Sequence, residues 1–103
     1  MILHIAVFSW KDDVTEADVT ALTEALLGMA AGIPQLKSYT AGTNLRLRPG
    51  GDYAVAAVVE DAAALDAYLD SEAHQQVYAD YLGRMIATRM AAQLPISSGA
   101  FIA

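Results

Sequence analysis

Two segments of the chain, residues 2–10 and 53–60, alternate so that apolar side chains fall on both faces of a strand. The first segment places isoleucine, alanine and phenylalanine on one face and leucine, isoleucine and valine on the other. A domain of this size can cover one face of such a sheet with its own helices, while the second face would stay exposed. We therefore expect two copies to pack sheet face against sheet face as a homodimer.

The segment between these strands predicts a helix and a second strand. Thr15 and Asp18 form a variant capping box at a helix start, and Gly32 followed by Pro34 ends the helical periodicity. Residues 36–47 are more polar and predict the second strand, followed by a Pro-Gly-Gly turn.

The second half of the chain predicts two further helical segments and a last strand. Asp61 can cap a short helix through Leu69, and Ser71 can cap another from residue 72 to about residue 92. Residues 96–102 are then expected to form the final strand. The resulting order, β-α-β-β-α-β, is that of an α+β ferredoxin-like fold with a four-stranded antiparallel sheet.

Composition limits the classes of function. The 103 residues have the size of a single domain, and 55% are hydrophobic, which fits a core shared across a subunit interface. A net charge of −6 argues against binding to nucleic acid or to anionic membranes. No run approaches the roughly 20 apolar residues of a membrane-spanning helix. His4 and the charged residues 11–13 also argue against a signal peptide, so we expect a cytoplasmic protein.

No cofactor or metal is expected. The chain has no cysteine, and the neighbouring Asp12 and Asp13 in a loop are a weak metal signal. No Gly-rich phosphate loop or other motif for a nucleotide, flavin or haem is present. Arg46 and Arg48 could hold a carboxylate, or could simply be solvated charges at the edge of the sheet.

Several segments together carry a resemblance to a known family. They are LHIAVF at residues 3–8, Ile33-Pro34, Gly42, DYAV at residues 52–55 and LDAYLDSEAH at residues 65–74. In this order and spacing the chain resembles the stress-responsive A/B barrel domain family, whose members are dimeric α+β barrels. The resemblance spans essentially the whole chain and implies a fold rather than one activity.

One plant relative in this family, olivetolic acid cyclase, closes a linear polyketide by aldol condensation with a tyrosine and a histidine. The resemblance places these two residues at Tyr68 and His74, and a histidine of the first strand at His4. Another pocket histidine of that enzyme corresponds to Val55. The His-Pro pair usual in the family is replaced here by residues 71 and 72, serine and glutamate.

His74 and Tyr68 are the candidate catalytic residues. In the first turn of a helix capped by Ser71, the free N–H groups and the positive end of the dipole disfavour a charged imidazole. A neutral His74 could remove a proton next to a carbonyl, and Tyr68 could donate a hydrogen bond to the enolate oxygen or orient the imidazole. Alternatively, both residues only pack in the core.

Candidate ligand-binding residues lie on the first strand and on the last helix. They are His4, Phe8, Trp10, Tyr78 and Tyr81. Histidines on apolar strands and aromatic stripes at helical spacing are more often core or interface residues, so this alternative stays open.

These observations favour a protein that binds an apolar or aromatic small molecule. The most specific hypothesis of this kind is a cofactor-independent enzyme resembling a polyketide cyclase or an isomerase. The alternatives are a non-catalytic stress or assembly protein and, third, a cofactor-independent monooxygenase or haem-degrading enzyme.

Overall fold

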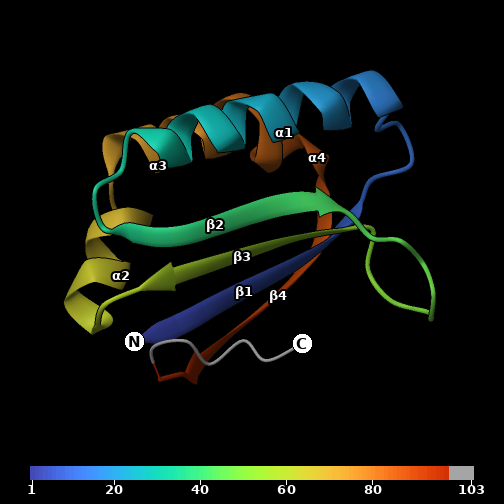
Figure 1. Cartoon of the computed structure of the whole chain (residues 1–103). Coiled ribbons are helices and arrows are strands. Elements are labelled where there is room, and N and C mark those ends of the chain that lie inside the picture. The colour runs from blue at the N-terminus through green and yellow to red at the C-terminus, as the bar shows by residue number, and fades with distance from the viewer. Residues whose placement is uncertain (98–103) are drawn as a thin grey trace.

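The computed structural model describes residues 1–97, which form one sheet and a layer of helices (Figure 1). The elements are β1 (Ile2–Trp10), α1 (Glu16–Ala31), β2 (Leu36–Thr43), β3 (Tyr53–Val59), α2 (Ala62–Leu69), α3 (Glu72–Val77), the π-helical turn η1 (Tyr78–Leu82), α4 (Gly83–Met85) and β4 (Ile86–Pro95).

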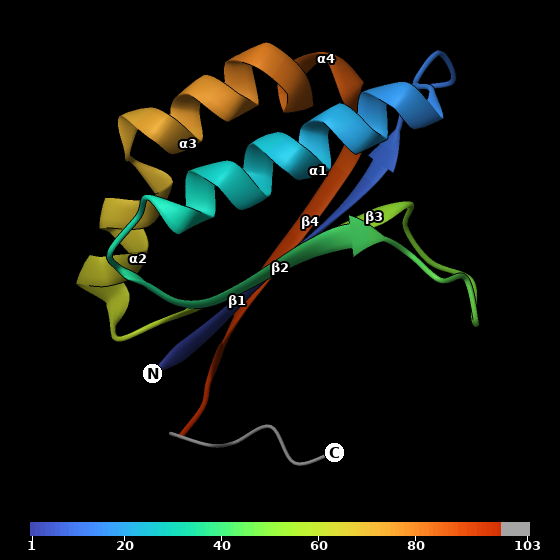
Figure 2. The same ribbon diagram turned by 45° about the horizontal axis from the view of Figure 1, so that its top comes forward.

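The four strands form an antiparallel sheet in the order β2-β3-β1-β4. The long helix α1 and the α3-to-α4 segment lie side by side over one face of the sheet, and α2 closes one end (Figures 1 and 2). The predicted α+β ferredoxin-like fold is thereby confirmed.

The helix starts follow the predicted caps. Thr15 and Asp18 exchange side-chain to backbone hydrogen bonds of 3.1 and 3.0 Å at the start of α1, which completes the capping box. The side chain of Asp61 accepts from Ala64 N at the start of α2. Ser71 accepts from His74 N at the start of α3. Local sequence therefore decides where each of these helices begins.

The fourth strand was predicted in the wrong place. Residues 86–95 form β4, although we expected the helix to continue to about residue 92. Residues 96–97 are not in a strand, and the rest of the predicted strand lies outside the described residues. Ala, Arg and Met have high helix propensity, but pairing along the whole of β1 overrides it. The second strand also ends earlier than predicted, at Thr43.

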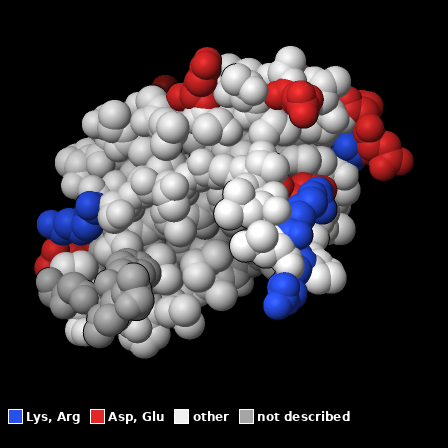
Figure 3. Space-filling model, turned by 45° about the vertical axis from the view of Figure 1, so that its right-hand side comes forward, with Lys and Arg blue, Asp and Glu red and all other residues white. Residues whose placement is uncertain are grey.

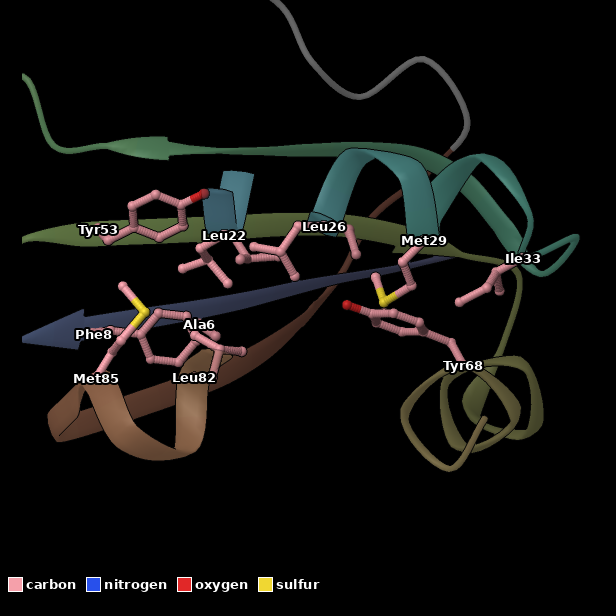
Figure 4. Close-up of a cluster of buried hydrophobic side chains, with 12 residues drawn as sticks. Ala6, Phe8, Leu22, Leu26, Met29, Ile33, Tyr53, Tyr68, Leu82 and Met85 are labelled. Atoms are coloured by element: carbon pink, nitrogen blue, oxygen red, sulfur yellow. The ribbon is translucent and has the colours of Figure 1, made fainter. Parts of the chain in front are cut away.

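The core lies between the helical layer and the sheet. Its buried side chains come from α1 and the turn after it, from alternate positions of β1 and β3, and from α2, η1 and α4 (Figure 4). They are Ala6, Phe8, Leu22, Leu26, Met29, Ile33, Tyr53, Val55, Ala57, Tyr68, Leu82 and Met85. Leu22, Leu26 and Met29 follow one another at helical spacing, and they form the side of α1 that faces the sheet.

The other face of the sheet carries none of the described helices (Figure 1). Val7 on β1 pairs with Met90 on β4, and Leu3 pairs with Leu94, so these four apolar side chains share this face. Met90 is 76% exposed and Leu94 is 48% exposed. The face is thus apolar and open in the single chain, as the two-sided alternation predicted.

Acidic side chains are most visible over the helical layer, along the upper edge of the molecule in Figure 3. Within residues 1–97, no helix combines the length and the apolar character needed to cross a bilayer.

Candidate functional site

A cavity of about 160 Å³ lies between the sheet and the helices. The pairing of the strands determines which side chains of the sheet lie below this cavity. Ala6 on β1 pairs with Val55 on β3 and with Ala91 on β4, and Val55 pairs in turn with Ala41 on β2. This row of small side chains crosses the sheet between two rows that carry larger ones, so a space remains below the helices.

Every helical element except α4 contributes to the wall. The lining residues are His4, Ala6, Phe8, Leu26, Tyr39, Val55, Tyr68, Leu69, His74, Tyr78, Leu82 and Arg89. Half of them are apolar, and the polar side chains are two histidines, three tyrosines and one arginine. Such a mixture of apolar walls and a few convergent polar groups is typical of small-molecule sites.

Tyr68 stands at the centre of the polar groups. Its ring reaches from α2 toward Met29 of α1, and its hydroxyl points into the interior (Figure 4). The ring meets His74 edge-on at 5.2 Å between centroids, with Tyr39 at 6.3 Å and His4 at 6.5 Å in similar geometry. Burial raises the pKa of Tyr68, which is 2% exposed, so the hydroxyl stays protonated at neutral pH.

His74 is placed by the first turn of α3. Ser71 Oγ accepts a 3.1 Å hydrogen bond from His74 N and donates a 2.8 Å bond to Tyr68 O, which links the two helices and the two candidate residues. Burial lowers the pKa of His74, and the charge of Arg89 lowers it further. The Leu69 backbone and the Asp70 carboxylate act in the opposite direction. The net effect favours the neutral imidazole.

His4 is buried on β1 below the same cavity. It is 3% exposed, and its Nδ1 lies 3.0 Å from Nε2 of Gln93, its pairing partner on β4. With the Gln93 amide as donor, Nδ1 accepts and Nε2 carries the proton. Burial lowers the pKa of His4, with smaller contributions in the same direction from Arg89 and His74. Both histidines are thus held neutral.

Tyr39 was not among the predicted site residues. It projects from β2 beside Ala57, in the same cross-strand row as His4 and Gln93. Its hydroxyl is buried without a hydrogen-bond partner among the described residues. Burial raises its pKa far above the usual value, and the neighbouring Tyr68 hydroxyl adds to this effect, although the two hydroxyls do not meet in the geometry of a normal hydrogen bond. Strand alternation puts Tyr39 and Ala41 on one face of residues 36–43 and Ser38 and Thr40 on the other, and this pattern could have identified Tyr39.

Arg89 was also missed, because its segment was predicted as helix. In β4 it pairs with Phe8 and therefore faces the helical side of the sheet, where it lines the cavity. Arg46, one of the two arginines considered from the sequence, instead pairs with Asp52 on the exposed loop after β2. Asp52 also accepts a 2.7 Å hydrogen bond from Trp10 N, so this ion pair has a local structural role.

Known proteins share this sequence pattern and this fold. The model of the stress-responsive A/B barrel domain matches residues 2–95. This chain belongs to the stress-responsive A/B barrel domain family. An uncharacterized protein from Streptomyces coelicolor is 36% identical over an alignment of 78 residues, and the match covers 73% of this chain and 80% of that protein.

Two solved structures illustrate the range of the A/B barrel fold. A dimeric ferredoxin-like protein of unknown function from Thermobifida fusca is 38% identical, with a TM-score of 0.85 over 92% of this chain and 90% of that one. Hydroxynitrile lyase from Passiflora edulis is 14% identical, with a TM-score of 0.78 over 93% of each chain. At that identity the second comparison establishes the shared fold alone.

The A/B barrel cavity gathers some of the predicted ligand-binding residues and not others. His4, Phe8 and Tyr78 line it together with the Tyr68–His74 pair. Trp10 lies outside, stacked on Phe8 at 5.9 Å and tilted against Tyr53 at 5.3 Å. Tyr81 packs against the core and is absent from the cavity wall.

Among residues 1–97, no cluster of three or more histidine, aspartate or glutamate side chains has a metal-binding arrangement. The polar groups of the cavity instead offer a neutral proton acceptor, His74, beside a protonated donor, Tyr68. This combination fits proton transfer at a carbon next to a carbonyl, with the hydroxyl held ready for the developing charge on oxygen.

Proposed function

We propose that this A/B barrel protein is a cofactor-independent enzyme that moves a proton in a small carbonyl compound, in the manner of an isomerase or a cyclase. The observation that carries the proposal is the edge-on contact of Tyr68 and His74, at 5.2 Å between ring centroids, on the wall of an internal cavity.

In the proposed step, the unprotonated nitrogen of His74 takes a proton from the carbon next to the carbonyl group. The electron pair of that C–H bond moves into the new carbon–carbon double bond, and the carbonyl π pair moves to oxygen. The Tyr68 hydroxyl donates a hydrogen bond to this oxygen. Where the enolate is conjugated to a second carbon–carbon double bond, the His74 imidazolium can return the proton to the far end of that system, which gives an isomer. Where the enolate carbon attacks a second carbonyl of the same molecule, a ring closes and the imidazolium protonates the resulting alkoxide.

The states of both side chains support these roles. A general base must be unprotonated at working pH, and burial together with Arg89 lowers the pKa of His74. A hydrogen-bond donor to an enolate must keep its own proton, and burial raises the pKa of Tyr68. The hydrogen bonds through Ser71 fix the backbones of both residues relative to each other.

The size of the cavity favours a small substrate. Its volume of about 160 Å³ is below the roughly 300 Å³ at which sites for drug-sized ligands begin. A single ring or a short carbonyl compound suits this space better than an extended polyketide chain. Val55, at the position of a pocket histidine in the plant cyclase, also favours a reaction different from that enzyme's.

We further propose that the protein works as a homodimer closed at the open face of the sheet. The Thermobifida fusca relative is described as dimeric. The exposed apolar face around Val7 and Met90 supports the same assembly here, because burial of such a face in a second copy removes it from water.

Deuterium exchange tests the proposed chemistry across a whole class of candidate substrates. A panel of small ketones and keto acids is incubated in D₂O with the protein, and loss of the proton next to the carbonyl is followed by NMR. We expect the wild-type protein to accelerate exchange in at least one compound. His74→Gln should lower this rate by about 100-fold or more. Tyr68→Phe should also lower it, because the oxygen then loses its donor.

The matched control is Gln75→Ala, which changes the next, exposed residue of α3 and should leave the rate unchanged. Thermal melting of each variant separates loss of fold from loss of chemistry. Undiminished exchange in His74→Gln would contradict the proposed base. No exchange in any compound, with His74→Gln changing only the stability, would favour the non-catalytic assembly protein.

A further inference from the structure

Arg89 gives the cavity a charge that the proposed proton transfer does not itself require. Among residues 1–97, it is the only lining residue with a fixed charge, and no aspartate or glutamate lines the cavity with it. This is unusual in a chain with 12 acidic and only 6 basic residues. The site therefore has a sign opposite to that of the protein as a whole.

Arg89 has no protein partner in the part of the chain that the structure describes. The ion pairs there are Lys37–Glu60, Arg46–Asp52 and Arg84–Asp18. No side-chain hydrogen bond joins Arg89 to another residue between 1 and 97. Its five N–H donors are thus available to a ligand or to water.

Strand register explains why Arg89 lies on the same side of the sheet as Tyr68 and His74. Arg89 pairs with Phe8, Ala91 with Ala6, and Gln93 with His4, so all three β4 residues face the helical side of the sheet. The alanines between Arg89 and His4 leave the space above them open. Arg89 is close enough for its charge to lower the pKa of both His4 and His74.

The Tyr39 hydroxyl is a second polar group that indicates a ligand in the same cavity. The Tyr39 hydroxyl is buried in the wall without a hydrogen-bond partner among residues 1–97. Burying a hydroxyl without a hydrogen-bond partner is unfavourable, so such atoms usually have a partner when a site is occupied. Tyr39 on β2 and Arg89 on β4 approach the cavity from opposite edges of the sheet.

From these observations we propose that the cavity selects a small carboxylate, held by Arg89, with its carbonyl end directed toward Tyr68 and His74. This proposal rests on the proposed function and names its substrate class: small keto acids or ring-bearing carboxylates. A guanidinium presents two parallel N–H groups that match the two oxygens of a carboxylate. One arginine and a small cavity suit a single negative charge better than a phosphate, which carries more.

The test compares three probes: benzoate, the neutral benzamide of nearly the same shape, and inorganic phosphate. Binding is measured by NMR titration of the histidine side chains and by thermal shift. We expect benzoate to bind about 10-fold or more tightly than benzamide, the ratio expected for one charge-assisted hydrogen bond. Bound benzoate should also raise the pKa of His4 and His74, since it offsets the charge of Arg89.

Arg89→Gln should weaken benzoate binding by about 10-fold or more and leave benzamide binding unchanged. Lys11→Gln makes the same change of net charge at an exposed position just after β1, outside the cavity, and should leave both unchanged. If Arg89→Gln does not fold, Arg89→Lys keeps the charge but loses the parallel pair of donors, and should weaken benzoate alone.

Equal binding of benzoate and benzamide, or undiminished benzoate binding in the folded Arg89 variants, would overturn the proposal. Phosphate binding as tight as benzoate would overturn the carboxylate assignment, and so would failure of all three probes to bind. The result is separable from the proposed chemistry. Benzoate binding that depends on Arg89, without deuterium exchange in any compound, would support the carboxylate site and reject the proton transfer.

Discussion

At the scale of single residues, the cavity differs from the core in the partners of its polar atoms. Tyr53 and Tyr39 both project from strands toward the helices, but the Tyr53 hydroxyl lies 2.7 Å from Thr23 Oγ1, whereas the Tyr39 hydroxyl has no partner among the described residues. A hydrogen-bonded tyrosine stabilises the fold, and an unpaired one reduces stability. The two tyrosines should therefore respond in opposite ways to the same substitution.

Tyr39→Phe should raise the free energy of unfolding by about 1 kcal/mol, because it removes a buried unpaired hydroxyl. Tyr53→Phe should lower it by about 1 kcal/mol, because the hydrogen bond between the Tyr53 hydroxyl and Thr23 Oγ1 is lost. Urea denaturation of the two variants and the wild type checks both values. A loss of stability in Tyr39→Phe would mean that its hydroxyl is paired in solution.

Stability should fall as the pH is lowered from 7 toward 5. Burial holds the pKa of His4 and His74 below 6.5 in the folded state, so the unfolded chain binds more protons in this window. The free energy of unfolding then rises with pH up to about the unfolded pKa and levels off above it. Arg89 acts in the same direction on both rings, and Asp70 opposes it at His74.

Denaturation at pH 5, 6, 7 and 8 measures this slope. His74→Gln should make it shallower, because one of the two titrating rings is gone. The pKa values of Asp18 and Asp52 are also lowered, from the usual 3.8, so these two carboxylates affect the free energy of unfolding only at more acidic pH. A stability that stays constant from pH 5 to 8 would contradict the neutral histidines.

At the scale of secondary-structure elements, helix caps decide both stability and placement of the site. Thr15 caps α1 far from the candidate residues, whereas Ser71 caps α3 and also bonds to the Tyr68 carbonyl. The Thr15 hydrogen bond stabilises one helix only. The Ser71 hydrogen bonds join the two helices that carry Tyr68 and His74.

Thr15→Ala and Ser71→Ala should each lower the free energy of unfolding by about 1 kcal/mol, the usual value for a lost N-cap. Ser71→Ala should in addition lower the rate of deuterium exchange, because His74 is less firmly placed beside Tyr68. Thr15→Ala should leave the rate unchanged and is the control. Equal rates in both variants would show that the cap is not needed to position the pair.

The elements also show where sequence analysis succeeds and where it fails. Caps and strand alternation are local, and they predicted the starts of α1, α2 and α3 and the whole of β1. The switch from η1 and α4 to β4 at Ile86 is not local. Residues 86–95 become a strand because their backbone groups pair along β1, and no cap or proline marks that change in the sequence.

At the scale of the whole molecule, the open face of the sheet predicts the assembly. Met90 is 76% exposed on this face, and Leu27 is 48% exposed on α1, over the opposite face. Met90→Glu should weaken the dimer, since a charge buried between two sheets is costly. Leu27→Glu should leave the dimer intact. Light scattering after size-exclusion chromatography measures the mass of each variant, and an unchanged dimer in Met90→Glu would place the interface elsewhere.

The sequence alone determined the α+β order and the two-sided strands, because caps, periodicity and alternation act between near neighbours in the chain. The candidate pair of Tyr68 and His74 came from the resemblance of the chain to its family. Tertiary structure decided where β4 lies, and with it that Arg89 faces the cavity. It also decided which residues form the cavity, and Trp10 and Tyr81 are not among them. The absence of a hydrogen-bond partner for the Tyr39 hydroxyl among residues 1–97 is likewise a result of the tertiary structure. These features depend on strand register, which brings together residues up to about 90 positions apart, as His4 and Gln93 show.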